Sequence, residues 1–332
     1  MDNTIIIQEL VHFISRKKGK EGAMAIKIDL EKAYDRLEWS FIRDTLKLFN
    51  FPNHLTLLII SCVSTSSISM LFNGGGLDYF LPSRGIRQGD PLSPRLFILC
   101  MEVLGALISE KCETKLWDHV KVAPGGIAFS HLFFVDDLVI FAKADQKNCA
   151  AIGDVLETFC ELFEQKVSDE KSQVFFSPNI SRETREDLCS TLGFQSTPAL
   201  GKYLGFPIKH ISNPHDFGFV IEHVQSLLSG WKSHLLSFAG RLVLTQAVTA
   251  TIPSYTMQCS ILPPKIIKCV DKLSRDFLWG SSKNKKKIHM VSWKKVTKPK
   301  KDGGLGLQAA KEKNIALLAK LNWRLHCEKE SL

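Results

Sequence analysis

The first part of the chain alternates between strand-like and helical spacing of its apolar residues. Residues 4–16 carry apolar side chains at helical intervals, and a charged turn, RKKGKEG, follows them. The next apolar run, AMAIKIDL, predicts a short strand whose last polar residue is Asp29. Residues 31–49 predict an amphipathic helix that ends before Pro52. The local order is therefore strand and then helix.

A hairpin, two helices and three further strands continue the pattern. Residues 66–83 predict a hairpin whose bend runs from Asn73 to Gly76. The Gly- and Pro-rich loop RGIRQGDPLSP then leads into a long apolar helix, RLFILCMEVLGALISEKC. After it, HLFFV and LVIFAKA predict paired strands, DQKNCAAIGDVLETFCELFEQ a helix, and VSDEKSQVFFS a strand. This order predicts an α+β fold with a small, mostly antiparallel sheet backed by helices.

The pattern becomes wholly helical from about Gln225 onward. We therefore predict two regions, 1–210 and an all-α region 211–332, with the changeover near residue 210. A basic loop, residues 283–301, has nine lysines and no acidic residue. Such a cluster forms either a solvated loop or a contact for phosphates, and the sequence does not distinguish the two.

Composition narrows the class of protein. The chain has 332 residues, 45% of them hydrophobic, which is enough for one large or two ordinary cores. Its net charge of +9 suits a polyanionic partner. The nine cysteines include no C-x-x-C pair, which favours reduced thiols in an intracellular compartment over a structural zinc site. No targeting signal or membrane span is recognisable, so we expect no membrane partner.

Two adjacent acids interrupt the apolar stretch HLFFVDDLVIFA. Asp136 and Asp137 lie at the predicted bend between two strands, and Asp29 lies at the end of another strand. If those strands are neighbours, three carboxylates meet at one edge of the sheet, and such an oxygen site suits Mg²⁺. Two ions about 4 Å apart would activate an attacking hydroxyl and stabilise a leaving pyrophosphate. The alternative is a purely structural Asp-Asp turn.

Five segments give the strongest signal: KIDLEKAYDRLEW, SRGIRQGDPLSPRLFILCMEVL, HLFFVDDLVIFAKA, QKVSDEKSQVFFSPN and KYLGFPI. Their order and spacing resemble those of reverse transcriptases, most closely those of plant non-LTR retrotransposons of the LINE type. The resemblance continues through WKSHLLSFAGRLVLTQAVTATIPSY, RDFLWG and DGGLGL, and so covers nearly the whole chain. It implies a polymerase palm with partial fingers over residues 1–210, followed by a thumb-like helical region over 211–332.

The resemblance also implies a metal site and a sugar contact. Asp29 and Asp136 would hold two Mg²⁺ ions, with Mn²⁺ as an alternative, and Asp137 would complete the acidic triad. Tyr34 falls where the family keeps an aromatic ring beneath the incoming sugar, which would exclude a 2′-hydroxyl. Core packing is the alternative role of Tyr34.

The loop after the predicted hairpin matches a nucleotide-binding loop of the family. Gln88 and Gly89 would line the nucleotide and template side of the pocket, because glycine lets the backbone approach a ligand and glutamine can donate and accept. Arg84 would contact phosphate or template, although exposed loop arginines often bind nothing specific.

Three further positions follow from the resemblance. Lys171 would neutralise or protonate the departing pyrophosphate, unless it is simply an exposed lysine in a polar turn. Tyr203, Leu204 and Gly205 resemble the turn that supports the primer terminus. Glu164 stands where the family leads us to expect glycine, which would alter the approach to Lys171.

The function that the resemblance implies is RNA-directed DNA polymerisation. Its partners would be an RNA template, a DNA primer and deoxynucleoside triphosphates, and its compartment the nucleus. The first fingers motifs and the endonuclease of complete elements are not recognisable, so we expect a fragment. The alternative is a catalytically inactive, nucleic-acid-binding remnant of a retroelement. The sequence leaves the oligomeric state open.

Overall fold

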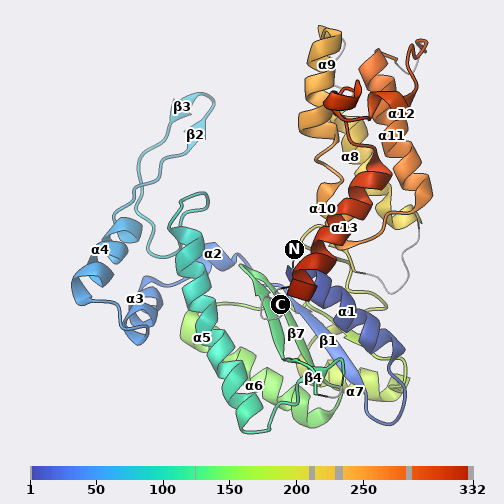
Figure 1. Ribbon diagram of the computed structural model, residues 1–332. Coiled ribbons are helices and arrows are strands. Elements are labelled where there is room, and N and C mark those ends of the chain that lie inside the picture. Colours follow the sequence, from blue (N-terminus) through green and yellow to red (C-terminus); the bar gives the residue numbers. More distant parts are fainter. Residues whose placement is uncertain (1, 124, 209–213, 229–234, 282–285, 328–332) are drawn as a thin grey trace. The chain divides into compact units, whose positions relative to one another are not determined.

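The structure is a computed structural model that describes residues 2–123, 125–208, 214–228, 235–281 and 286–327 (Figure 1). Contacts divide the chain into two compact units. One comprises Ile6–His210, and the other comprises Met1–Ile5 with Ile211–Leu332. Strands and helices are mixed in the first unit, which confirms the predicted α+β character of the fold.

The unit Ile6–His210 contains the sheet and the helices that pack on it. Its helices are α1 (Asp2–Arg16, which begins in the other unit), α2 (Ala33–Arg36), α3 (Trp39–Leu48), α4 (Asn53–Ser64), α5 (Ser93–Glu113), α6 (Gln146–Phe163) and α7 (Arg182–Leu192). Its strands are β1 (Ala23–Ile28), β2 (Leu71–Phe72), β3 (Gly75–Gly76), β4 (Val120–Lys121), β5 (Ala128–Phe129), β6 (His131–Phe134), β7 (Asp137–Lys143), β8 (Gln173–Phe176), β9 (Gln195–Ser196), β10 (Lys202–Tyr203) and β11 (Phe206–Pro207).

A five-stranded sheet of order β6-β7-β1-β8-β9 forms the centre of this unit. Strand β1 pairs antiparallel with both β7 and β8, and only the edge pair β8–β9 is parallel. The sheet is therefore small and mostly antiparallel, as the alternation of strands and hairpins predicts. The central strand β1 and its neighbour β7 carry the candidate acids at their ends.

One face of the sheet packs against α5 and α6. Alternate residues of each strand point to this face, among them Ile26 of β1 and Ile140 of β7, and both are fully buried. Phe97 of α5 and Phe159 of α6 belong to the same core. The hydrophobic effect of this large apolar cluster holds β1 and β7 in register, and so fixes where the strands end.

The prediction of one continuous helix over residues 31–49 is wrong. The structure has two helices instead, α2 and α3, separated at Leu37, whose backbone is extended and whose side chain is buried. The amide of Gly85 donates to the carbonyl of Leu37 (2.8 Å), and the amide of Ile86 donates to that of Tyr34 (2.9 Å). A loop distant in sequence therefore takes the carbonyls that a continuous helix would have used.

The predicted hairpin 66–83 is present but short. Strands β2 and β3 have two residues each, and Asn73 and Gly74 form the bend between them. Both bend residues have positive φ values, 48° and 82°, as two-residue hairpin turns require.

Helices are the only regular secondary structure in the described residues of the second unit. It contains η1 (Pro214–Phe217), α8 (Gly218–Leu228), α9 (Phe238–Leu244), the π-helical turn η3 (Thr245–Thr249), α10 (Ser254–Cys259), α11 (Pro264–Trp279), α12 (Trp293–Val296), η4 (Lys300–Asp302) and α13 (Ala310–Cys327). These helices agree with the helical pattern that the sequence predicts from about Gln225 onward. Across both units, no helix in the described ranges has the length and apolarity needed to cross a membrane.

The structure describes most of the basic loop 283–301. Its positions 283–285 lie outside the described residues. Further along, α12 and η4 interrupt it, and Val296 of α12 is buried with Leu278 and Leu307. Most lysines that the structure describes here remain exposed, so the segment combines an apolar anchor with a basic surface.

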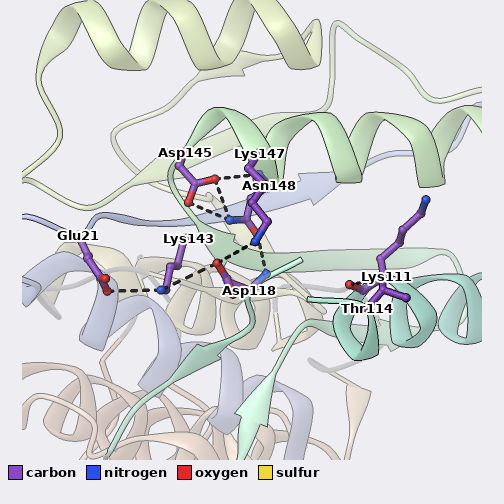
Figure 2. Close-up of polar contacts among 8 residues, drawn as sticks. All are labelled: Glu21, Lys111, Thr114, Asp118, Lys143, Asp145, Lys147 and Asn148. Atoms are coloured by element: carbon purple, nitrogen blue, oxygen red, sulfur yellow. Dashed lines mark hydrogen bonds and ion pairs between the residues drawn. The ribbon is translucent and has the colours of Figure 1, made fainter. Parts of the chain in front are cut away.

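A polar network closes the end of the sheet opposite the candidate acids (Figure 2). Asp145 caps α6 by accepting the amide of Asn148 (2.8 Å). The buried Asn148 side chain accepts the amide of Asp118 (2.6 Å) and donates to both carboxylate oxygens of Asp145. Lys143 and Lys147 form ion pairs with Asp118 at 3.9 and 3.7 Å. One asparagine thus links the segment after α5 to the start of α6.

We expect Asn148→Ala to lower the free energy of unfolding by about 1–3 kcal/mol, because the amide of Asp118 loses its buried acceptor. Urea denaturation followed by circular dichroism measures this change. Lys147→Ala is the matched control in the same network. Its ion pair is exposed, so the expected loss is about 0.5 kcal/mol or less. Equal losses in the two variants would contradict this account.

Candidate active site

The three candidate acids lie where two neighbouring strands end. The antiparallel register pairs Ile28 with Leu138, so one step further along β1 brings Asp29 opposite Asp137. Asp136 occupies the two-residue turn that joins β6 to β7. Acids more than a hundred residues apart in the sequence are therefore brought to one edge of the sheet by the pairing of β1 with β7.

The turn between β6 and β7 carries backbone strain. Val135 has a φ of 56°, a left-handed conformation that a β-branched side chain rarely adopts. Such a residue costs on the order of 1–3 kcal/mol and persists only where its surroundings enforce it. Here the paired strands on both sides of the turn enforce it, and the result is a tight bend that presents Asp136.

The carboxylates are close enough to influence one another. Burial is the largest effect on Asp137, and it raises the pKa of that carboxyl. The Lys27 ammonium opposes this shift, whereas Asp136 and Asp29 reinforce it. Burial raises the pKa of the Tyr34 hydroxyl as well, and the charge of Asp136 contributes to that shift. Burial of the Asp137 carboxyl, with smaller contributions from its two acidic neighbours, therefore outweighs the charge of Lys27.

Lys171 lies beside Asp29 because the turn 166–172 is bound to that residue's backbone. The Ser168 amide donates to the carbonyl of Asp29 (2.8 Å), and the amide of Asp29 donates to Ser172 Oγ (3.1 Å). Lys171 Nζ is 3.6 Å from Asp29 Oδ1, and its side chain is 69% exposed. An ion pair this exposed adds little stability, so the exposed ammonium is available to a ligand.

Ser168 and Ser172 contact Asp29 in a way that the sequence did not predict. Both side chains are buried, and both serine residues bond to the backbone of Asp29. Serines in a polar turn are unremarkable in a sequence, so their spacing alone gave no signal for this role.

Tyr34 packs its ring against the hydrophobic core of the sheet. The ring stacks on Phe97, with centroids 4.8 Å apart and an angle of 6° between the planes. This contact agrees with the alternative role of Tyr34 in packing, but the ring is only partly buried, and the charge of Asp136 affects the pKa of its hydroxyl. Its predicted place beneath the incoming sugar stays a prediction.

The loop 84–90 is tied to α2 at its beginning and exposed at its tip. A side chain at Gly85 would come within 2.9 Å of the carbonyl oxygen of Asp35, so this position needs glycine. Gln88 and Gly89 are exposed, and the φ of Gly89 is 88°. The predicted nucleotide loop therefore presents these two residues on a surface next to the Tyr34 backbone.

Arg84 is engaged with acids outside the triad. Its guanidinium lies 3.6 Å from carboxylate oxygens of both Glu38 and Glu164. A substrate contact by Arg84 would have to compete with these ion pairs. Glu164 itself has a φ of 50°, the conformation that favours glycine, which agrees with the glycine expected there.

Tyr203, Leu204 and Gly205 belong to a small hairpin, which we call hairpin 202–207. Tyr203 pairs with Phe206, and the two turn residues, Leu204 and Gly205, have φ values of 49° and 76°. Both Tyr203 and Phe206 are buried. Lys27 Nζ donates to the carbonyl oxygen of Lys202 (2.7 Å), a contact that the sequence reasoning did not anticipate.

The three acids have the chemistry that a hard cation needs, but their side chains are not close enough together to surround one ion. Carboxylate oxygens without nearby His or Cys ligands are the donors that Mg²⁺ and Mn²⁺ prefer. Asp29, Asp136 and Asp137 supply such oxygens, and their mutual repulsion is the condition that a cation relieves. Within the described ranges, no three His, Cys, Asp or Glu side chains are close enough together to hold a metal ion.

Comparison with known proteins gives a family match and several relatives. Residues 3–208 match the model of the family described as "Reverse transcriptase (RNA-dependent DNA polymerase)". A protein of Arabidopsis thaliana whose name refers to ribonuclease H is 52% identical over 120 residues, which are 36% of this chain and 19% of that protein.

Two relatives come from mobile elements of animals. The transposon TX1 149 kDa protein of Xenopus laevis is 23% identical over 310 residues, 92% of this chain and 22% of the relative. The Pol polyprotein of the type-2 retrotransposable element R2DM of Drosophila melanogaster is 32% identical over 142 residues, 43% of this chain and 12% of the relative. The chain spans less than a quarter of the length of each of these three relatives.

We expect Asp137→Asn to raise the melting temperature in EDTA at neutral pH by about 1–3 °C, because it removes one of three repelling carboxylates. Thermal unfolding measures the change. Added Mg²⁺ or Mn²⁺ should then stabilise the native chain more than the variant.

Asp35→Asn is the control for this measurement, because Asp35 is an exposed acid in the first turn of α2. We expect Asp35→Asn to change neither the melting temperature in EDTA nor the stabilisation by Mg²⁺ or Mn²⁺. A lower melting temperature for Asp137→Asn in EDTA would contradict the repulsion described here.

Proposed function

Because this chain belongs to the reverse transcriptase (RNA-dependent DNA polymerase) family, we propose that it carries the polymerase core of a LINE-type retroelement. The family membership confirms the resemblance drawn from the sequence motifs. The proposed reaction is the transfer of a deoxynucleotide to the 3′-hydroxyl of a DNA primer on an RNA template. In an intact element this copying would take place at nicked chromosomal DNA in the nucleus.

The convergence of Asp29, Asp136 and Asp137 is the observation that carries this proposal. A structural Asp-Asp turn would need no third acid on the neighbouring strand, whereas nucleotidyl transfer needs oxygen ligands for divalent ions. The register of β1 with β7 supports the shared site. In this proposal, residues 1–210 form the polymerase palm with partial fingers, and residues 211–332 form the thumb-like region.

The proposed cofactor is a pair of Mg²⁺ ions, for which Mn²⁺ can substitute. Asp29 and Asp136 would hold them, and Asp137 would complete the set of acids. When bound, the ions make the primer hydroxyl more acidic and offset the charge on the departing pyrophosphate. The chain's own task is to hold the carboxylates at the strand ends, where the backbone contacts of Ser168 and Ser172 fix Asp29.

The nucleotide would lie between Tyr34 and the loop 84–90. The stacking of Tyr34 on Phe97 leaves the ring little freedom to move away, so a 2′-hydroxyl would be excluded by contact. Gln88 and Gly89 would offer polar groups and open backbone to the base and template side. Arg84 would contact phosphate only by leaving its present carboxylate partners.

Lys171 and hairpin 202–207 complete the proposed arrangement. The exposed Lys171 ammonium beside Asp29 would donate a proton or positive charge to the leaving pyrophosphate. Tyr203, Leu204 and Gly205 would support the primer terminus. The basic surface of the chain would attract the template and primer backbones.

The second candidate function is nucleic-acid binding without catalysis. One observation favours it: in the part of the chain that the structure describes, the acids do not yet form a three-ligand metal group. A remnant of this kind would keep its basic surfaces and its template affinity but would not incorporate nucleotides.

Primer extension on an RNA template with Mg²⁺ separates the two functions. We expect the native chain to incorporate deoxynucleotides and Asp136→Asn to lose about a hundredfold or more of that rate, because a ligand for both proposed ions loses its charge. Template binding by fluorescence anisotropy should be unchanged in the variant. Equal binding with no incorporation by either protein would instead favour the remnant.

Sugar selection tests the role of Tyr34. We expect Tyr34→Ala to reduce the preference for deoxynucleotides over ribonucleotides by about tenfold or more, because removing the ring opens space for the 2′-hydroxyl. Competing incorporation of the two nucleotides measures this preference. Tyr34→Phe keeps the ring and is expected to keep the preference. If Tyr34→Ala kept the native preference for deoxynucleotides, the role of Tyr34 would be packing alone.

A further inference from the structure

A single lysine, Lys27, stands out within an otherwise buried strand. The other five residues of β1 are buried, and only Lys27 is partly exposed. Because Lys27 is partly buried, its ammonium loses some of its contact with water and needs polar partners to offset that cost. Side chains alternate along a strand, so Lys27 shares its face of the sheet with Asp29, two positions further on.

Lys27 links hairpin 202–207 to the face of the sheet that carries Asp29 and Asp137. Its Nζ donates to the carbonyl oxygen of Lys202, 175 residues further along the chain. Lys27 pairs with Val139, which lies two residues from Asp137 in β7, so the lysine shares its face of the sheet with Asp137. The lowering effect of Lys27 on the pKa of Asp137 agrees with this closeness.

Hairpin 202–207 needs such an external contact. Its two strands have two residues each, and a hairpin this short is not stable by itself. Burial of Tyr203 and Phe206 holds its side chains, and the Lys27 bond holds its backbone at the first residue. This bond is accessible to water, so it positions the hairpin rather than dominating its stability.

From this geometry we infer that Lys27 is a positioning residue that sets hairpin 202–207 at a fixed place relative to Asp29 and Asp137. The inference rests on the proposed function only in its consequence, which is that the primer terminus is aligned with the carboxylates. One strand carries both Asp29 and Lys27, about 7 Å apart along its axis. Any shift of β1 would therefore move Asp29 and the hairpin together.

Hydrogen–deuterium exchange of the full chain tests the link without any need for activity. Lys27→Met keeps the apolar stem and removes the ammonium. We expect exchange of the amides in 202–207 to accelerate by about threefold or more, with exchange in β7 and α6 unchanged. Native exchange rates in 202–207 would overturn the inference.

The matched control is Lys171→Met, which removes the other ammonium beside Asp29. Lys171 is paired with Asp29 and not with residue 202, so exchange in hairpin 202–207 should stay native. Acceleration in this control equal to that of Lys27→Met would overturn the inference, because charge loss alone would then explain the result. Lys27→Gln, which is too short to reach residue 202, gives the same test if Lys27→Met does not fold.

Primer-extension kinetics give the functional readout. We expect Lys27→Met to raise KM for the primer–template by about fivefold or more, with kcat changed by about twofold or less, as a displaced primer support should do. A loss confined to kcat would mean that Lys27 acts only on the carboxylates, and would overturn the inference. If the native chain incorporates nothing, the proposed function fails, and the exchange experiment still decides the role of Lys27.

Discussion

The antiparallel pairing of β1 with β7 is the constraint on which the rest of the site depends. This pairing is fixed by a hydrophobic core on one face of the sheet, and it places Asp29 opposite Asp137 at the strand ends. A shift of one residue would turn the core-facing side chains to the other face, so the register cannot slip without loss of the core. The energy of apolar burial thereby holds together acids that repel each other.

The surrounding contacts each offset part of that repulsion or limit the movement that it would cause. Lys27 and Lys171 bring positive charge to the two strand-end acids. Ser172 binds the backbone of Asp29, and the strained Val135 holds the bend in which Asp136 lies. Strain and like charges in one place are typical of functional sites, where stability is lower than it could be.

The sequence predicts the parts of this site that depend on local pattern, and misses those that depend on contacts between distant segments. Short apolar runs bounded by polar residues predict β1 and β7, and acids at their ends predict the convergence. The break between α2 and α3 could not be predicted in this way, because the distant loop residues Gly85 and Ile86 take the carbonyls there. The roles of Ser172 and Lys27 have the same cause: their partners lie 143 and 175 residues away. Lys171, Tyr203 and the nucleotide-loop residues stay predictions, although the structure gives each a defined position.

The central claim is that Asp29 and Asp136 share divalent ions at one edge of the sheet. A crystal of the chain with primed template and Mn²⁺, examined by anomalous scattering, tests it most directly. The account predicts manganese about 2.2 Å from carboxylate oxygens of both residues. Manganese bound elsewhere, with these two carboxylates more than about 8 Å apart, would contradict it.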